Sequence, residues 1–337
     1  MGDNLYYTVA TGGTGVDNDE WTEPKPVLAG GTVGVGSADR PALASFQGRL
    51  WCVHRGPGND VQLYWTSFKY ATPGAQDGGW SVDAPISNQL SGGAPALAVF
   101  NDQLWCEYEG GSPSHSNPDL YYTFYDSSAG EWSNGQVIPN QMSDSGPALA
   151  VFQGQLWCVY RGGSSDVNDD NPQLYYTIWD GKNWSNAVSI SNQMSNRQPA
   201  LAVFNNQLWC AYHGGAPSHD NPHLYYTVCN GYHWTDGQPI TDEISGGGPT
   251  LVYDTPVKEL VCMWTGNEAG LYNQLRYSNR KVANSQWPTA RTVSTPTEGV
   301  ECYSELNTGP ALAEFQFIDT KQVSYDMIMC VYRNSLV

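Results

Sequence analysis

The residues best suited to chemistry lie in polar segments that each follow a Leu-Trp-Cys motif or a close variant of it. These segments start at Arg55, Glu109, Arg161, His213 and Thr265, and they are rich in Asn, Asp, Gly and Pro. Amide, carboxylate and guanidinium groups hydrogen-bond to hydroxyls, while a Tyr or Trp ring can stack on the C–H face of a sugar. The mixture suits a carbohydrate. The ligand-binding residues that we predict are Arg55, Asn59, Asp60, Glu109, His115, Asn117, Arg161, Asp170, Asn171, His213, His219 and Asn221.

The same residue types also form turns, so a purely structural interpretation of each loop stays open. Loops on a rigid scaffold are nevertheless the usual carriers of binding residues. Residues 87–89, 139–141 and 191–193 each end in Asn-Gln. We place them in the segments that connect one repeated unit, or blade, to the next, on the same face of the molecule as these loops.

Catalytic and metal-binding patterns are weaker. No GxSxG or HExxH motif occurs, and Glu107 and Glu109 share one segment without an obvious counterpart acid. The acidic stretch 166–171 lacks EF-hand spacing, which favours a solvated turn over a Ca²⁺ site, although Ca²⁺ stays an alternative. We therefore predict no catalytic residue, no metal site, no cofactor and no enzymatic activity.

A repeat organises the whole chain. Pro-Ala-Leu-Ala-x-Phe, followed by a short turn and Leu-Trp-Cys-x-Tyr, recurs with variations, and a Leu-Tyr-Tyr-Thr segment and a Trp follow in most units. A repeat of roughly this length is typical of propeller blades. The copies start at Pro41, Pro95, Pro147, Pro199, Pro249 and Pro310.

The last unit stops after Cys330-Val331-Tyr332, and its missing half stands at the start of the chain as Leu5-Tyr6-Tyr7-Thr8 and Trp21. A ring without open sheet edges gains from such a permutation. We predict an all-β fold: a six-bladed β-propeller with four-stranded antiparallel blades, formed by 1–337 as one domain. The N-terminal strand in 1–25 would complete the blade begun at 310–337, and the Trp segment would be the outermost strand of each blade.

Six of the eight cysteines occupy one repeat position and are therefore spread around the ring. Disulfide geometry needs Cα atoms within about 7 Å, so we predict buried free thiols, with Cys229 and Cys302 as an alternative pair. The recurring tryptophans are interpreted as blade-packing residues.

The net charge of −18 disfavours nucleic acid and anionic lipid as partners. No stretch has the length and apolarity of a membrane span, and the start of the chain lacks a signal peptide pattern. We expect a soluble protein that is cytoplasmic or released by a non-classical route, and the sequence leaves its oligomeric state open.

The blade count, the closure and the Asp/Asn-Gly…Trp ending of each unit resemble the six-bladed propeller lectins of the fucose-binding and tectonin types. In the fucose-binding lectins an Arg and a Glu grip the sugar, whereas the matching places here hold Gln155-Leu156 and Tyr176. The segment Thr177-x-x-Asp180-Gly181-x-x-Trp184 is also similar, one residue out of register, to the repeated box of sialidase-type propellers.

The resemblance implies a multivalent carbohydrate-binding lectin with sites between blades and glycans or glycoconjugates as partners. A protein-interaction or toxin-associated propeller module is the first alternative, and a sialidase-like exo-glycosidase is the second.

Overall fold

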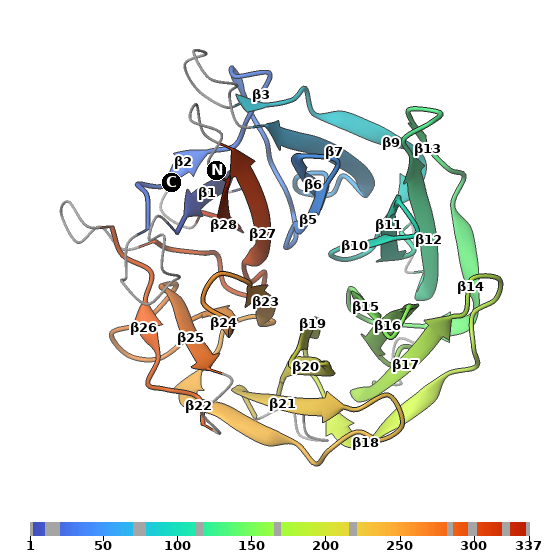
Figure 1. Ribbon diagram of the computed structural model, residues 1–337, viewed down its shortest axis with the longest axis vertical. Coiled ribbons are helices and arrows are strands. Elements are labelled where there is room, and N and C mark those ends of the chain that lie inside the picture. The colour runs from blue at the N-terminus through green and yellow to red at the C-terminus, as the bar shows by residue number, and fades with distance from the viewer. Residues whose placement is uncertain are drawn as a thin grey trace.

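The computed structural model describes residues 3–10, 21–69, 79–111, 117–164, 170–215, 221–281, 286–295, 302–318 and 324–334. These residues form strands and loops, and they contain no helix long and apolar enough to cross a membrane. The strands form sheets that surround a central axis (Figure 1). The prediction of an all-β propeller is confirmed.

Five blades each come from one continuous stretch of chain. In every one, the strand nearest the axis (β5, β10, β15, β19 or β23) pairs antiparallel with the strand that follows it, which pairs in turn with the next (Figure 1). The first blade contains β3 (Leu28–Ala29), β4 (Val33–Gly34), β5 (Ala42–Phe46), β6 (Arg49–Arg55), β7 (Gln62–Lys69), β8 (Gly79–Trp80) and β9 (Ala84–Leu90). The second contains β10 (Ala96–Phe100), β11 (Gln103–Glu109), β12 (Asp119–Asp126), β13 (Glu131–Trp132) and β14 (Gln136–Met142).

The next three blades have four strands each. They are β15 (Ala148–Phe152), β16 (Gln155–Arg161), β17 (Gln173–Trp179) and β18 (Val188–Met194); β19 (Ala200–Phe204), β20 (Gln207–His213), β21 (His223–Cys229) and β22 (Gln238–Ile244); and β23 (Thr250–Asp254), β24 (Glu259–Thr265), β25 (Leu275–Lys281) and β26 (Arg291–Thr292).

A composite sheet closes the ring. It joins β27 (Ala311–Ile318) and β28 (Ser324–Arg333) from one end of the chain to β1 (Leu5–Val9) and β2 (Lys25–Pro26) from the other. β1 pairs antiparallel with β28 from Leu5 opposite Arg333 to Val9 opposite Met329.

The prediction of six blades is therefore wrong, because five blades are continuous units and the remaining sheet is assembled from both ends of the chain. The prediction of four-stranded antiparallel blades agrees with the third, fourth and fifth blades. The predicted outermost strand is correct only in part. Trp80 and Trp132 lie in the two-residue strands β8 and β13, which pair with the third strand, whereas Trp184 and Trp234 make only isolated bridges. The third strand also pairs with β9, β14, β18 or β22. Residues 87–89, 139–141 and 191–193, which we had placed in crossings, lie within these strands.

The repeat explains the inner hairpins. Asn205 and Asn206 have φ angles of 51° and 56° between the paired residues Phe204 and Gln207. A two-residue turn with both φ positive matches the right-handed twist of the strands, and Asn tolerates this conformation. The turn fixes the register, so every blade presents the same positions to its neighbours.

The hydrophobic core lies between adjacent sheets. One cluster, for example, joins Trp105 and Tyr122 of the second blade to Leu156 and Cys158 of the third. Because both faces of a blade are covered, its strands are apolar almost throughout. All eight cysteines are buried free thiols, as predicted.

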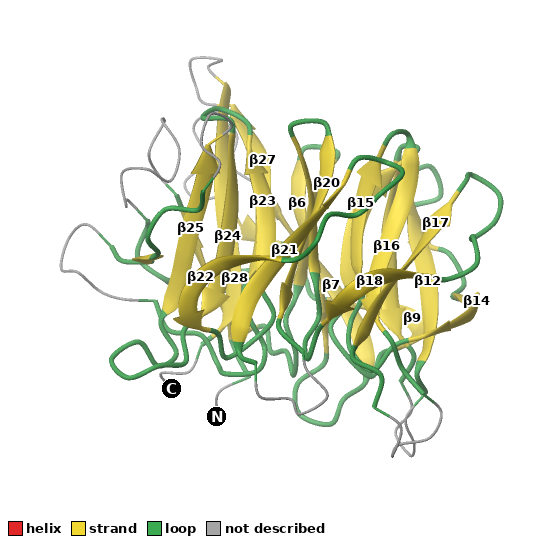
Figure 2. Cartoon of the chain, turned by 90° about the horizontal axis from the view of Figure 1, so that it is seen from below, coloured by secondary structure: helices red, strands yellow, loops and turns green. Residues whose placement is uncertain are grey.

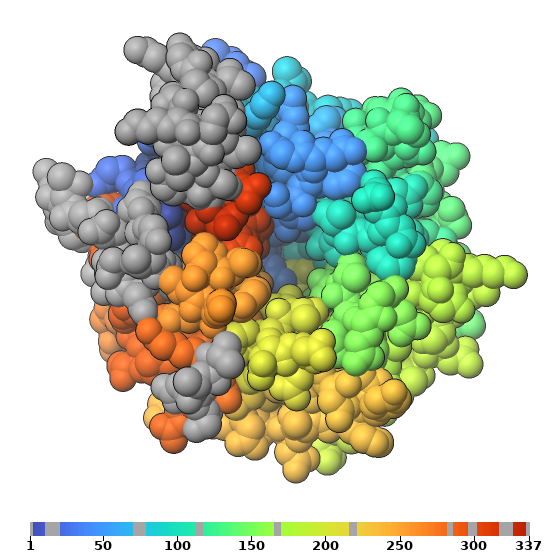
Figure 3. Space-filling model, viewed as in Figure 1, coloured from blue at the N-terminus to red at the C-terminus, as the bar shows by residue number. Residues whose placement is uncertain are grey.

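The axis has two ends. Figure 2 shows both chain termini on one face of the ring, where Arg333 at the end of β28 contacts Asp3. Figure 3, viewed as Figure 1, shows a hollow at the centre of the ring. A cavity of about 110 Å³ on the axis is lined by the starts of the innermost strands.

Candidate functional site

The second strands all stop at the end of the axis near the termini, which we call the mouth. Their last residues occupy one repeat position but differ in chemistry, and they are Arg55, Glu109, Arg161, His213, Thr265 and Arg333. A position required only for packing would tend to keep one residue type. The differences between blades therefore make the mouth the first place to look for specificity.

Short crossing segments line the mouth between these strand ends. Five of them begin with a buried serine whose Oγ donates to the carbonyl two residues later, as Ser37 does to Asp39 (2.7 Å) and Ser195 does to Arg197 (2.7 Å). Such side-chain-to-backbone bonds fix tight turns. The crossings consequently hold their own side chains in defined places beside the strand ends.

Two side chains close the axis just below the mouth. Arg40, which is 7% exposed, donates from Nη1 to the carbonyl of Pro249 (2.5 Å) and from Nη2 to that of Pro199 (3.2 Å). Gln198 donates to the carbonyls of Pro147 (2.6 Å) and Pro95 (3.3 Å). The equivalent positions hold Ala94, Gly146 and Gly248, and a Cβ added to Gly146 would lie 2.8 Å from Gln198 Nε2.

Ion pairs fix the carboxylates of the mouth. Arg55 Nη1 lies 2.8 Å from Asp39 Oδ2, and Arg161 Nη1 lies 3.1 Å from Asp144 Oδ2. Arg161 also pairs with Asp170 through Nη2 and donates from Nε to the carbonyl of Ser195 (3.0 Å). Charge-assisted bonds of this kind hold both partners in a set orientation.

Glu109 interacts electrostatically with both the Arg55–Asp39 pair and the Arg161–Asp144 pair. Burial raises the pKa of its carboxyl to about 8, helped by the negative charges of Asp144 and Asp39 and opposed by the positive charges of Arg55 and Arg161. Its carboxyl rests against the glycine crossing, because a Cβ on Gly93 would lie 2.9 Å from Oε2. At neutral pH the mouth thus combines a protonated carboxylic acid with Asp39 and Asp144, each paired with an arginine.

Other predicted residues serve the fold. His213 is buried and its ring contacts the carbonyls of Gly214 (3.1 Å) and Ser245 (3.2 Å), and burial lowers its pKa. Thr265 is buried, Asn59 is exposed, and Asp60 accepts bonds from the Gln62 amide and the Tyr64 hydroxyl within its own loop.

Three of the four predicted asparagines, Asn117, Asn171 and Asn221, repeat one arrangement. The Asn117 amide donates to the Tyr121 hydroxyl (3.2 Å) and its Oδ1 accepts from the Asp119 amide (3.2 Å). Asn171 and Asn221 do the same with Tyr175 and Tyr225. His115 and His219 lie outside the described residues, as does most of the acidic stretch 166–171.

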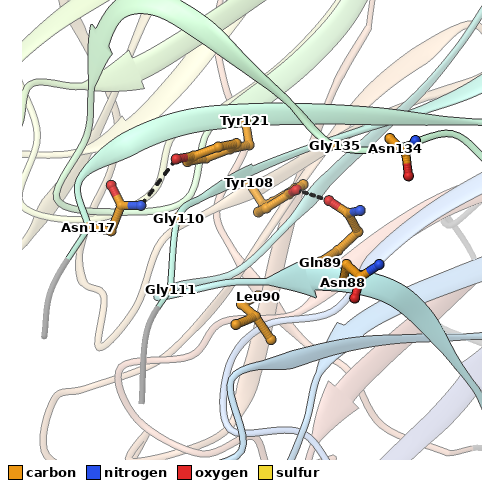
Figure 4. A pocket seen from close by; sticks show the side chains of 10 residues that line it. All are labelled: Asn88, Gln89, Leu90, Tyr108, Gly110, Gly111, Asn117, Tyr121, Asn134 and Gly135. Carbon is orange, nitrogen blue, oxygen red and sulfur yellow. Dashed lines mark hydrogen bonds between the residues drawn. The ribbon is translucent and has the colours of Figure 1, made fainter. Parts of the chain in front are cut away.

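Two equivalent pockets open between blades (Figure 4). The first has a volume of about 330 Å³, and in it the Tyr108 hydroxyl donates to Gln89 while Asn117 donates to Tyr121. The second, about 290 Å³, places Tyr212, Gln193, Asn221 and Tyr225 in the same positions. Their polar groups largely satisfy one another, and no carboxyl group of the described residues lines the first pocket.

A third pocket, of about 460 Å³, departs from this pattern. It is lined by Trp287 and by the carboxylates of Asp242, Glu243 and Glu268. Glu243 accepts from Arg276 Nε (2.9 Å) and Nη2 (2.5 Å), so one of the three acids is bound within the fold. Among the described residues, no group of three or more His, Cys, Asp or Glu side chains is arranged to hold a metal ion.

Arg55, Glu109, Arg161 and Asp170, which we predicted as ligand-binding residues in sites between blades, lie at the mouth, and the sequence did not point to Asp39, Arg40, Asp144 and Arg197. These four stand in short crossings that showed no motif. A signal was present, because the residue before the repeated proline changes from Gly or Ala to Arg40 and Gln198 in two units.

The chain was compared with known proteins. No protein-family model matches it, and no curated protein sequence does. Among solved structures, a protein of unknown function from Dyadobacter fermentans is similar, with a TM-score of 0.57, 11% identity, and coverage of 88% of this chain and 94% of that one. The structure of YjhT has a TM-score of 0.50, 14% identity, and coverage of 86% and 95%.

An enzyme is also among these structures. The exo-β-1,3-galactanase from Phanerochaete chrysosporium, solved with galactose, has a TM-score of 0.50, 10% identity, and coverage of 86% of this chain and 70% of that one. At such identities the likeness shows the fold alone. It nevertheless contradicts the prediction of a lectin without enzymatic activity, because the architecture from which we inferred a lectin is shared with a glycoside hydrolase.

Proposed function

We propose that this chain is an exo-acting glycoside hydrolase whose active site is the mouth of the propeller. The observation that supports this most is Glu109, a carboxylic acid that burial keeps protonated at neutral pH beside Asp39 and Asp144. Glycoside hydrolysis usually requires two carboxyl groups, one that is protonated at the working pH and one that is ionised. The galactanase, similar in fold, adds that a propeller of this kind can carry such chemistry.

Each carboxyl group would have its own role. Protonated Glu109 would donate its proton to the glycosidic oxygen as the bond to the anomeric carbon breaks. Asp144, held by Arg161, would act from the other side, either on the anomeric carbon or on the water that attacks it. The hydroxyl group of the attacking water is bonded to the anomeric carbon at the end of the reaction. The remaining proton of that water replaces the proton that Glu109 gave to the leaving group, so the carboxyl groups return to their starting state.

The closed axis favours attack at a chain end. Arg40 and Gln198 bridge the axis below the mouth, so a polysaccharide cannot thread through the ring at this level. A terminal sugar directed into the mouth would stop at these side chains. This geometry supports exo rather than endo action.

The first test is Glu109→Gln, assayed on β-1,3-galactotriose and on p-nitrophenyl glycosides of common hexoses, pentoses and hexuronic acids. Loss of the general acid should lower kcat by roughly 10² or more while the melting temperature changes little. Glu131→Gln, an exposed glutamate in the same blade, is the matched control. Hydrolysis that is equal in Glu109→Gln and wild type, or absent from both across the panel, would overturn the proposal.

The pH profile provides a second readout. Because Glu109 must be protonated to act and its pKa is about 8, kcat/KM should fall as the pH rises through about 8. In Glu109→Gln this alkaline limb should disappear from any residual activity. An alkaline limb that is the same in both proteins would assign it to another group.

A further inference from the structure

Arginines gather at the mouth of an otherwise acidic protein. The chain has nine arginines and a net charge of −18, yet Arg40, Arg55, Arg161, Arg197 and Arg333 all lie around this one end of the axis. In a chain with this net charge, we expect each arginine at the mouth to be positioned by specific partners. The partners of each guanidinium therefore indicate which arginine has binding capacity left.

Four of the five bind an aspartate or a carbonyl oxygen. Arg55, Arg161 and Arg333 pair with aspartates, and Arg40 is buried against proline carbonyls. Arg55 Nε also lacks a hydrogen-bond partner among the described residues, but the charge of Arg55 is paired with Asp39. Arg197 differs, because its only hydrogen bond from the side chain to another described residue runs from Nη2 to the Asn307 amide oxygen (2.6 Å). Its Nε is buried and has no hydrogen-bond partner among the described residues. A buried donor without a partner is costly, and a ligand acceptor would satisfy it.

The crossing next to this contact is built of glycines. Asn307, which accepts the bond from Arg197, donates from its backbone amide to the Gly246 carbonyl (2.8 Å), and residues 246–248 are all glycine. A Cβ on Gly246 would lie 2.4 Å from Leu306 Cδ2, so a larger residue would disturb this crossing. Burial and the positive charge of Arg161 both lower the pKa of Arg197, as expected for a cation that lacks an anionic partner.

We infer that the sugar bound at the mouth carries a carboxylate, which Arg197 receives beside Arg161, so that the substrate class is a glycan ending in a uronic or related sugar acid. A guanidinium with an available Nε and a terminal nitrogen can bind a carboxylate in bidentate geometry. This inference rests on the proposed function, since it assumes that the mouth is the substrate site.

The test compares pairs of sugars that differ only by the carboxylate. D-galacturonate and D-galactose, and D-glucuronate and D-glucose, are titrated by calorimetry into Glu109→Gln, which separates binding from turnover. The acid of at least one pair should bind roughly tenfold tighter than its neutral partner. That preference should disappear in Glu109→Gln/Arg197→Gln, return in part with Arg197→Lys, and persist with Arg49→Gln, a change at an exposed arginine outside the mouth.

The two ideas fail in different ways. Equal binding of acid and neutral sugars, or a preference that survives Arg197→Gln, would overturn the acidic substrate class even if neutral glycosides are hydrolysed. Selective binding of a uronate through Arg197 without hydrolysis of any uronide or hexoside would uphold the carboxylate site and overturn the hydrolase. Thermal unfolding of each variant shows whether the fold is retained.

Discussion

At the scale of single residues, the two glutamates of β11 lie in different environments and differ in their expected roles. Glu109 faces the mouth, whereas Glu107 is fully buried between the second and third blades, beside the Cys158 thiol. In the described part of the chain, neither oxygen of Glu107 accepts a hydrogen bond from an N–H or O–H group. Burial raises the pKa of Glu107 to about 8, and contact with the Cys158 thiol opposes this rise. The same position holds Val53 and Val159 in neighbouring blades, so the repeat itself does not require an acid there.

Glu107 should make the fold sensitive to alkaline pH. Its folded pKa lies above the ordinary value of 4.5, so the native state binds the extra proton, and stability falls as pH rises from about 4.5 to about 8. The loss should be about 5 kcal/mol at most. Glu107→Gln should flatten this part of the stability curve, and Glu107→Val should also raise the melting temperature. Melting curves from pH 5 to pH 9 that change in parallel for all three proteins would contradict this.

At the scale of elements, the interface between the fourth and fifth blades has an Arg–Glu ion pair where the earlier interfaces have a Tyr–Gln hydrogen bond. Tyr108, Tyr160 and Tyr212 each donate to a glutamine of the preceding blade. In the fifth blade, Arg276 makes a bidentate pair with Glu243 instead, and both groups are largely buried. The pair therefore joins β25 to β22.

Arg276→Met should destabilise the protein by roughly 2–4 kcal/mol, because it leaves Glu243 without its charged partner in a partly buried site. Arg49→Met, which removes an exposed arginine that contacts Ser67, should change stability by less than about 0.5 kcal/mol. Chemical unfolding of both variants makes the comparison, and similar effects would show that the pair contributes nothing specific.

The sequence predicted inner strands better than outer ones. The motif around Pro199 is apolar, ends in an Asn-Asn turn and gives the β19–β20 hairpin directly. The outer strand β18 is polar and contains Asn192 at a φ of 60°, features that also typify loops, so its strand character depends on pairing with β17. At the mouth, comparison of blades identified Glu109, but Arg197 could not be found because its contact is with Asn307, 110 residues further along the chain.

At the scale of the whole molecule, the ring depends on the sheet that both chain ends share. β1 contributes Leu5 and Val9, which are 0% and 4% exposed, to the core, and it covers the edge of β28. Asp3 adds an ion pair with Arg333 at the mouth. Without β1, the β28 edge would expose unpaired N–H and C=O groups, which favour association with another chain.

Removal of residues 1–10 should therefore cost at least about 3–6 kcal/mol from the burial of Leu5 and Val9 alone. Calorimetry should show a lower melting temperature, and size-exclusion chromatography should show dimers or larger species formed through the β28 edge. A synthetic peptide of residues 1–10 should restore the monomer and most of the melting temperature, whereas a scrambled peptide should not. A truncated chain that stays monomeric with an unchanged melting temperature would show that β1 is dispensable for closing the ring. The peptide separates loss of the strand from general misfolding, because only a ring that is otherwise formed offers it the β28 edge.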